Sequence, residues 1–418
     1  MVREPSLPAW GDFASLVGYG DRWRRYRRLV NPWLTKKAVT AHHKYQEHSA
    51  RKLIQRLLEH HQKVLSTHKL ENELFLSISA TLLRSIYGYE AVASDDCCPV
   101  ETQAIFSFMT KSLLTSSYLV NIIPVLKYAP EWLPEAGWKR DAIKWRKGKD
   151  TLIKDISKLI QSTDESSQII FGSLRTQTLS IGLTDKEAED YVDQIAITMF
   201  AGETDTNVNT LLMFFMAMVL YPSVQKKAHD EIDLVLGHSR LSKVEDQAQL
   251  NYIDRIVQET LRWAPVTPIG IPINNGLGLI LNITKEAFPH TCFWDDVYKG
   301  HRIPKGAIVI GNVWAMTRDE TVYKNAEAFD PDRFLNSTAL PSPLFGRCPG
   351  VHFAQSSLFI TIASILMAFD IRATKDGNGQ DILPSGKMTS SAVLTPEHVE
   401  FELTPRSEKH KELARNGL

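Results

Sequence analysis

The pattern of apolar and polar positions along the chain predicts a mainly helical protein. Apolar residues recur at helical spacing, with charged faces between them, in segments 50–59 and 145–160. A long helix is predicted from Thr184 to Leu220, because Thr184 and Glu187 fit a capping box and Pro222 ends the pattern. Further helices are expected at 223–236, 252–263 and 351–369.

Signals for β-strands are fewer and lie late in the chain. Segment 303–306 is predicted as a turn, 307–313 as an apolar strand and 391–403 as paired short strands. The expected fold class is therefore mainly α with small β-sheets, and without any shift in composition we expect one domain over 1–418. The longest apolar run, 211–221, is shorter than the ~20 residues that span a membrane, so it predicts a buried core helix.

Composition narrows the classes of function. The chain has 418 residues, of which 43% are apolar, and its 48 basic residues balance 48 acidic ones. This balance argues against nucleic acid as a main partner. Four cysteines do not make a disulfide framework in a chain of this length. Cys97, Cys98 and Cys292 are interpreted as reduced or buried thiols, and only Cys348 stands in a context that suggests chemistry.

Cys348 lies in Phe-Gly-Arg-Cys-Pro-Gly, residues 345–350, directly before the predicted helix 351–369. A thiol at the start of a helix meets the positive end of the helix dipole and free backbone N–H groups, which are expected to lower its pKa. A bound metal ion would deprotonate it outright. Taken alone, the motif also fits a simple helix-start thiol.

Three motifs in a fixed order change this interpretation. Cys348-Pro-Gly with the following 351–355 resembles the haem-binding loop of the cytochrome P-450 family. Glu259-Thr-Leu-Arg262 resembles the family's Glu-x-x-Arg, and segment 329–334 resembles its later Arg-containing motif. The resemblance implies a cytochrome P-450 fold, with Cys348 as the ligand of the haem iron. It also implies that Glu259, Arg262 and Arg333 form a buried triad that braces the haem side.

A fourth motif, Trp23-Arg-Arg-Tyr-Arg27, resembles the family's Trp-x-x-x-Arg. One helical turn separates Trp23 from Arg27, and both offer N–H donors that suit haem propionates. A basic surface helix is the alternative interpretation, and it is the one expected for Arg24, Arg25 and Arg28. By position in the family, the resemblance adds His290 and Arg347 to the cofactor contacts. In the same way, it places Val266, Ile269 and Ala392 in the substrate pocket.

Polar residues interrupt the apolar pattern of the long predicted helix at 201–207. Polar side chains in the middle of a helix need a reason. The family places an acid–Thr pair here, beside the iron, that delivers protons to bound oxygen. An ungapped match anchored at 216–222 assigns these roles to Asp205 and Thr206. Glu203 then replaces a small residue and Asn207 a second Thr or Ser, and a register with Glu203 as the acid stays open.

The chain departs from the family pattern in three places. By comparison with the family pattern, we expect the amino-terminal anchor and the first helices and strands to be absent. Phe345 stands three positions before Cys348, where the family has seven, so the haem loop is short and we expect haem to bind poorly or not at all. Segment 273–289 is interpreted as an insertion that resembles a translated intron, and we expect it to loop out to the surface.

The resemblance implies a haem-thiolate monooxygenase of fungal type, acting in secondary metabolism. Such a protein binds haem b through Cys348 and takes electrons from an NADPH-cytochrome reductase. It inserts one atom of O₂ into a small apolar substrate, and we expect a monomer at the endoplasmic reticulum membrane. The alternative is a non-catalytic relic whose short loop fails to hold haem. An unrelated helical binding protein would require the four ordered motifs to be a coincidence.

Overall fold

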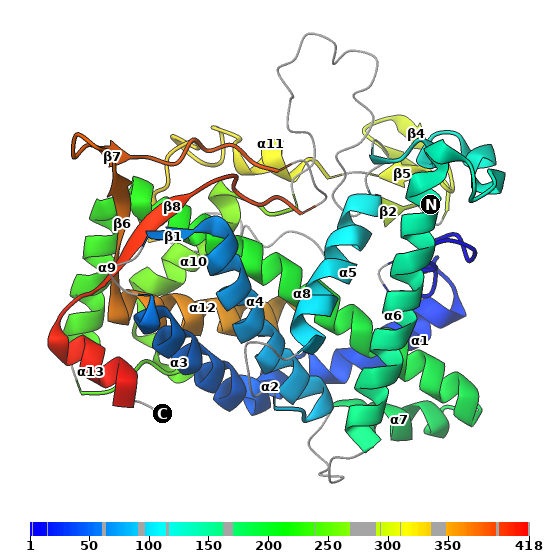
Figure 1. Ribbon diagram of the computed structural model, residues 1–418, viewed down its shortest axis with the longest axis horizontal. Helices are drawn as coiled ribbons and strands as arrows, with labels where there is room; N and C mark the ends of the chain where they lie inside the picture. The colour runs from blue at the N-terminus through cyan, green and yellow to red at the C-terminus, as the bar shows by residue number, and fades with distance from the viewer. Residues whose placement is uncertain are drawn as a thin grey trace.

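Helices form most of the computed structural model (Figure 1), which describes residues 1, 3–14, 16–60, 64–90, 97–113, 117–161, 170–237, 239–267, 290–292, 294–309, 311–335, 348–389 and 393–416. The longer helices are α1 (Asp21–Val30), α3 (His43–Glu59), α4 (Thr67–Leu82), α5 (Cys97–Leu113), α6 (Gly137–Gln161), α7 (Ile170–Ser180), α8 (Asp185–Leu220), α9 (Pro222–Val235), α10 (Asn251–Trp263), α12 (Val351–Ala368) and α13 (Glu408–Asn416). Helices α2 (Lys36–Val39) and α11 (Val313–Thr317) are short, as are the turns of 3₁₀ helix η1 (Asn31–Trp33), η5 (Leu119–Asn121), η6 (Pro124–Tyr128), η7 (Pro134–Ala136) and η9 (Pro331–Phe334).

Helix α8 is the longest helix in the described part of the chain and crosses the molecule in Figure 1. Its 36 residues span about 54 Å at the α-helical rise. It begins where the Thr184 and Glu187 side chains cap each other's backbone N–H groups, and it ends at Pro222, the first residue of α9. This confirms the prediction of a long helix that contains both Asp205 and Thr206.

The hydrophobic core lies where α8, α12, α10, α3 and α4 pack together. Helix α12 is apolar on all sides, and from Leu358 to Ala368 every residue is buried. Among the described residues it is the one helix long and apolar enough to cross a membrane by itself, but 78% of it is buried inside the protein. Its composition therefore reflects its central place in the core.

The strands are short: β1 (Val64–Ser66), β2 (His290–Thr291), β3 (Asp296–Tyr298), β4 (His301–Ile303), β5 (Ile308–Val309), β6 (Phe369–Lys375), β7 (Asp381–Ile382) and β8 (Glu400–Pro405). Four of them form an antiparallel sheet in the order β1-β8-β6-β7, with Ile371 opposite Leu403. Strands β2 and β5 form a pair, and β3 and β4 form a hairpin. The predicted fold class, mainly α with small β-sheets, is confirmed.

Two strand predictions were wrong in detail. Of segment 307–313, only Ile308–Val309 is a described strand, because the Asn312 side chain caps α11 by accepting from the Ala315 N–H at 3.0 Å. In segment 391–403 the strand β8 starts at Glu400, and it pairs with β6 and β1 from distant parts of the sequence. The apolar side chains of β8 are buried in the core, which favours that pairing. The predicted insertion 273–289 lies outside the described residues.

Candidate active site

Cys348 stands directly before α12, followed by Pro349 and by Gly350 as the N-cap. The residue is accessible, but its thiol stands in dense protein surroundings, and this burial raises the thiol pKa. The nearby carboxyl of Glu203 also raises that pKa, whereas the Gly350 N–H and the charge of Arg27 lower it. The expectation that the helix start would lower the pKa of the free thiol was therefore wrong, because burial outweighs it. A coordinated metal ion would still deprotonate the sulfur.

Helix α1 brings Trp23 and Arg27 to the same place. The Arg27 guanidinium lies 5.8 Å from the centre of the Trp23 ring, and both residues are partly buried. The helix is fixed to α8 by Arg22, whose Nη2 donates to Asp190 Oδ2 at 2.7 Å. Arg27 is close enough to Cys348 to affect its pKa. Trp23 thus lies beside Arg27, and the charge of Arg27 reaches the thiol of Cys348.

A surface cavity of about 340 Å³ opens next to Cys348. It is lined by η1, α2 and the start of α12, with Lys36 and His352 at its sides. Cys348 can therefore be approached from the surface on this side of the molecule.

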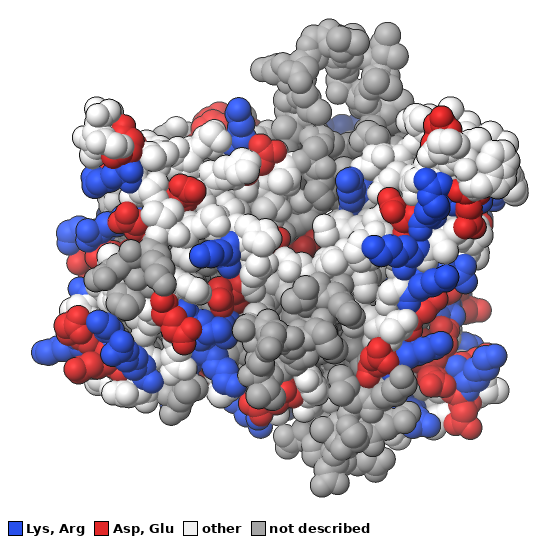
Figure 2. Space-filling model, in the orientation of Figure 1, with Lys and Arg blue, Asp and Glu red and all other residues white. Residues whose placement is uncertain are grey.

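The middle of α8 presents an open face. Gly202 is exposed, and no atom of the described residues lies within 4 Å of the point where a Cβ on this glycine would stand. The Thr206 hydroxyl donates to the Gly202 carbonyl oxygen at 2.7 Å, and Asp205 and Thr206 are both partly exposed. Burial raises the pKa of Asp205 to about 6, and the charge of Glu71 on α4 adds to the rise. Figure 2 shows a hollow in the middle of this side of the molecule, with acidic atoms at its floor.

Glu203 is buried, with 9% of its surface exposed, and it lies on a different side of α8 from Gly202 and Thr206. The Asn207 side-chain amide donates to Glu203 Oε1. Burial raises the pKa of Glu203 to about 8, so its carboxyl is largely neutral at pH 7. Its other oxygen, Oε2, lies 3.5 Å from the point where a Cβ on Gly350 would stand, and Cys348 Sγ lies 4.0 Å from the same point. Glu203 therefore reaches from α8 to the Cys348 loop.

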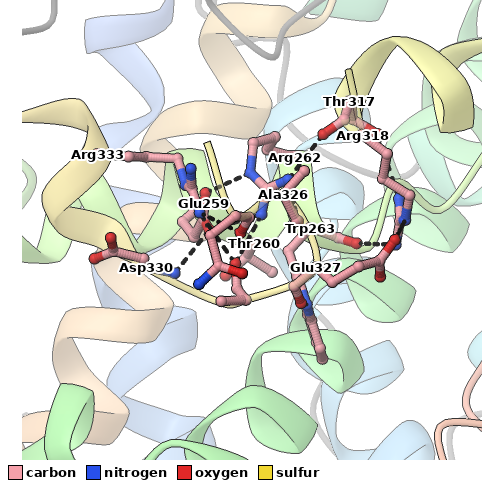
Figure 3. Close-up of polar contacts among 12 residues, drawn as sticks. Glu259, Thr260, Arg262, Trp263, Thr317, Arg318, Ala326, Glu327, Asp330 and Arg333 are labelled. Atoms are coloured by element: carbon pink, nitrogen blue, oxygen red, sulfur yellow. Dashed lines mark hydrogen bonds and ion pairs between the residues drawn. The ribbon is translucent and has the colours of Figure 1, made fainter. Parts of the chain in front are cut away.

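The structure brings Glu259, Arg262 and Arg333 together (Figure 3). Glu259 and Arg262 have no exposed surface. Glu259 Oε1 accepts from Arg262 Nη2 at 2.8 Å, from Arg333 Nε at 3.0 Å and from the Asp330 backbone N–H at 2.8 Å. Its other oxygen accepts from Arg262 Nε at 2.7 Å. The buried carboxylate is thus fully hydrogen-bonded, as a buried charge requires.

The remaining donors of Arg262 hold the segment that follows α11. Its guanidinium donates to the carbonyl oxygens of Thr317 and Ala326, both at 2.8 Å, and of Ala328 at 3.0 Å. One buried ion-pair cluster therefore fixes the path of the chain from α11 to η9. This segment has little regular structure of its own to fix it.

The predicted pocket residues fall partly within the described structure. Val266 is buried, and its carbonyl oxygen accepts from the Leu394 N–H at 2.7 Å. His290 lies in β2 opposite Val309, but its side chain is outside the described part. Ile269, Arg347 and Ala392 also lie outside the described residues.

Two contacts near the open face of α8 were missed from the sequence. Glu71 on α4 affects the pKa of Asp205, and the Thr395 hydroxyl donates to Asn209 Oδ1 at 2.6 Å. Asn209 could have been predicted from the sequence, because it is a polar residue within an apolar helix. Nothing in the sequence indicated Glu71, since only the packing of α4 on α8 brings it near Asp205.

Side chains in the middle of α8 repeatedly bond to the helix's own backbone. Thr204 and Thr206 donate to the carbonyl oxygens four residues earlier, at 2.7 Å, and Asn209 and Thr210 do so at 2.8 Å. Each of these carbonyls therefore serves two donors, one from the side chain and one from the helical N–H.

The donors around Cys348 suit a haem group in kind and place. Cys348 offers a thiolate ligand, and Trp23 and Arg27 offer N–H donors for propionates on the same side. Asp205 and Thr206 lie on α8, the helix that carries Glu203 toward Cys348. Glu203 is the exception to the fit, because its side chain extends into the space between α8 and Cys348.

Comparisons with known proteins identify the family. The family model described as Cytochrome P450 matches residues 6–275 and 280–403, with its interruption inside the predicted insertion. Cytochrome P450 monooxygenase 226 of Postia placenta is 30% identical over 97% of this chain and 76% of its own length. Cytochrome P450 monooxygenase claR of Ampulloclitocybe clavipes is 33% identical over 97% and 73%, respectively.

A solved zebrafish cytochrome P450 with progesterone has the same fold. Its TM-score is 0.77 at 22% sequence identity, covering 97% of this chain and 87% of the zebrafish chain. Fold, site and sequence thus define one class, the haem-dependent monooxygenases. The chain belongs to the cytochrome P450 family, and its curated relatives are fungal monooxygenases.

Proposed function

We propose that this protein is a haem-thiolate monooxygenase that binds haem b through Cys348 and oxidises a small apolar substrate. One observation carries the proposal: Cys348 lies just before α12, where Glu203 reaches it from α8, the helix that bears Asp205 and Thr206. Haem held by a thiolate activates O₂ for insertion of one oxygen atom into an organic substrate. The family implies a reductase partner, O₂ and an organic substrate. We assign an NADPH-cytochrome reductase as the electron donor.

Each residue has a distinct part in it. Cys348 would supply the sulfur ligand, and Trp23 and Arg27 would hold the propionates and so orient the group. Asp205, with a pKa of about 6, can exchange protons near neutral pH, and the Thr206 hydroxyl next to it can pass a proton toward the open face of α8. Burial and, to a smaller extent, the charge of Glu71 keep the pKa of Asp205 raised.

The cavity beside Cys348 supports a place for the electron donor. Lys36 borders it, and Lys37 and Arg28 are exposed on neighbouring helices. A basic surface favours an acidic partner by charge complementarity. We place the reductase contact here, within reach of the sulfur.

The protein's surface supports a site of action at a membrane. Five side chains between η5 and η7 are large, apolar and 55–78% exposed: Leu119, Ile122, Val125, Tyr128 and Trp132. The β3–β4 hairpin carries two further exposed apolar side chains, Val297 and Tyr298. Trp and Tyr favour the membrane–water interface. Flotation with liposomes tests this: L119S/V125S/W132S should lose binding, whereas L234S on α9 should keep it.

The central test is the absorption spectrum of the reduced, carbon monoxide-bound protein after loading with haem. A thiolate-type Soret band is expected for the natural chain, and C348A should lose that band even if it still takes up haem. C292A is the matched control and should keep the band, since Cys292 lies by the β2–β5 pair. A band that is unaffected by C348A would overturn the proposal. Weak haem binding, caused by the short loop before Cys348, stays a prediction. Titrating the natural chain with haem measures it.

A further inference from the structure

The side chain of Glu203 occupies an unusual place. It extends from α8 to the start of α12, and its Oε2 and the sulfur of Cys348 both lie within 4.0 Å of a single point above Gly350. It is buried there and held by the Asn207 amide. Within the part of the chain that the structure describes, only the Asn207 amide is recorded as a polar partner of this buried carboxyl, and a buried acid so sparsely bonded is not explained by stability.

The position matters because of what must lie between the two helices. The proposed function, on which this inference rests, puts the iron on Cys348 and next to Asp205 and Thr206. Glu203 belongs to the same turn of α8 as these two residues and reaches the Cys348 loop. A planar group bound by Cys348 and facing α8 would overlap the Glu203 carboxyl in its present position.

We propose that Glu203 is a gating side chain for haem: it closes the site in the haem-free protein and must swing out before haem binds. The open space beside Gly202, the preceding residue, offers room for the outward position. The Asn207 amide favours the inward position. If the inward position outnumbers the outward one about ten to one, the apparent Kd for haem is raised about tenfold.

The volume of the side chain, and not its charge, is what this gate depends on. E203A removes the obstacle, so its apparent Kd for haem should fall about tenfold. E203Q keeps the size and should bind like the natural chain. N207A removes the bond that holds Glu203 inward and should bind more tightly than the natural chain. E189A is the matched control, because Glu189 is exposed at the other end of α8, and it should leave the Kd unchanged.

The experiment is a titration of the purified haem-free variants with haem, followed by absorbance, with circular dichroism to verify that each variant is folded. Tighter binding by E203A and N207A, but not by E203Q, supports the gate. Equal or weaker binding by E203A, or no binding by any variant, overturns it. The double variant E203A/C348A shows whether removal of the Glu203 side chain still improves haem binding when the proposed ligand is missing. In the single variant E203A, tighter haem binding without a thiolate-type band would contradict the role of Cys348 and leave the gate standing.

Discussion

At the scale of single residues, the direction of a side chain decides more than its identity. Glu203, Asp205 and Thr206 lie within one turn of α8, yet Glu203 points to the Cys348 loop and the other two border the open face. The sequence showed polar residues in an apolar helix but left two registers open for the acid. Side-chain direction follows from the packing of α8 against α12 and α4, which no local pattern contains.

Replacing Thr206 tests the assignment of the proton relay. T206A in the haem-loaded protein should uncouple the reaction, so that consumed O₂ appears as hydrogen peroxide. Product per NADPH should fall about tenfold or more, because the hydroxyl next to Asp205 is lost. T206S should restore coupling, and T204A is the control, since the Thr204 hydroxyl is buried and bonded within the helix. Unchanged coupling in T206A would move the relay elsewhere, with Glu203 as the alternative acid.

The buried carboxylate of Glu259 can be tested through stability. E259Q leaves the guanidinium groups of Arg262 and Arg333 without their counter-charge in a buried place. The free energy of unfolding should drop by roughly 3–5 kcal/mol, as when one partner of a buried ion pair is removed. Urea denaturation of the haem-free protein measures it. D230N breaks an exposed pair with Lys226 and should change little, and an equal loss in both variants would contradict the argument.

At the scale of elements, local signals predicted helices well and strands poorly. The limits of α8, α9 and α10 followed from Thr184, Pro222 and Pro265, which act within a few residues of themselves. Helices α4, α5 and α7 were not singled out, because their burial patterns are set by several neighbours. Strand β8 was placed too early, since its partners β6 and β1 come from distant parts of the chain.

The start of α8 gives a prediction at this scale. T184A removes the hydroxyl that accepts from the Glu187 N–H, so the free energy of unfolding should fall by about 1 kcal/mol. Thermal or urea unfolding measures the change. T176A, on the exposed side of α7, is the control and should cost less than about 0.5 kcal/mol. A loss no larger in T184A than in T176A would mean that tertiary packing alone fixes this helix end.

At the scale of the whole molecule, the core rather than the surface charge determines the fold. The net charge is zero, and the largest buried side chains lie on helices that meet around α8 and α12. The family could be predicted from the sequence, because the motifs around Cys348 and Glu259–Arg262 consist of a few residue types at fixed spacings. The route of the chain around the site was less predictable, because buried groups such as Arg262 fix irregular segments through backbone carbonyls.

Buried histidines give the folded state a pH dependence. Burial lowers the pKa of His42 and of His229 to about 4. Between pH 6.5 and about 4, both histidines therefore stay neutral in the folded protein, whereas they take up protons in the unfolded chain. Each therefore stabilises the fold fully above pH 6.5. This contribution is lost at about 1.4 kcal/mol per pH unit as the pH falls toward 4. Urea unfolding at pH 7 and 5 should show a smaller pH effect in H42Q, whereas H301Q, at an exposed position, should match the natural chain.

The shared carbonyls in the middle of α8 have a mechanical consequence. A carbonyl oxygen that accepts from a side-chain hydroxyl or amide as well as from its helical N–H bonds that N–H more weakly. Residues 204–210 should therefore have weaker backbone hydrogen bonds than the rest of this long buried helix. Deuterium exchange of the amides at 207–210, all of them buried, should be faster than at 211–219, where the helix is apolar and also buried. Equal exchange along both stretches would argue against this softness. Flexibility confined to residues 204–210, beside the site, would let the rest of α8 stay rigid while ligands enter and leave.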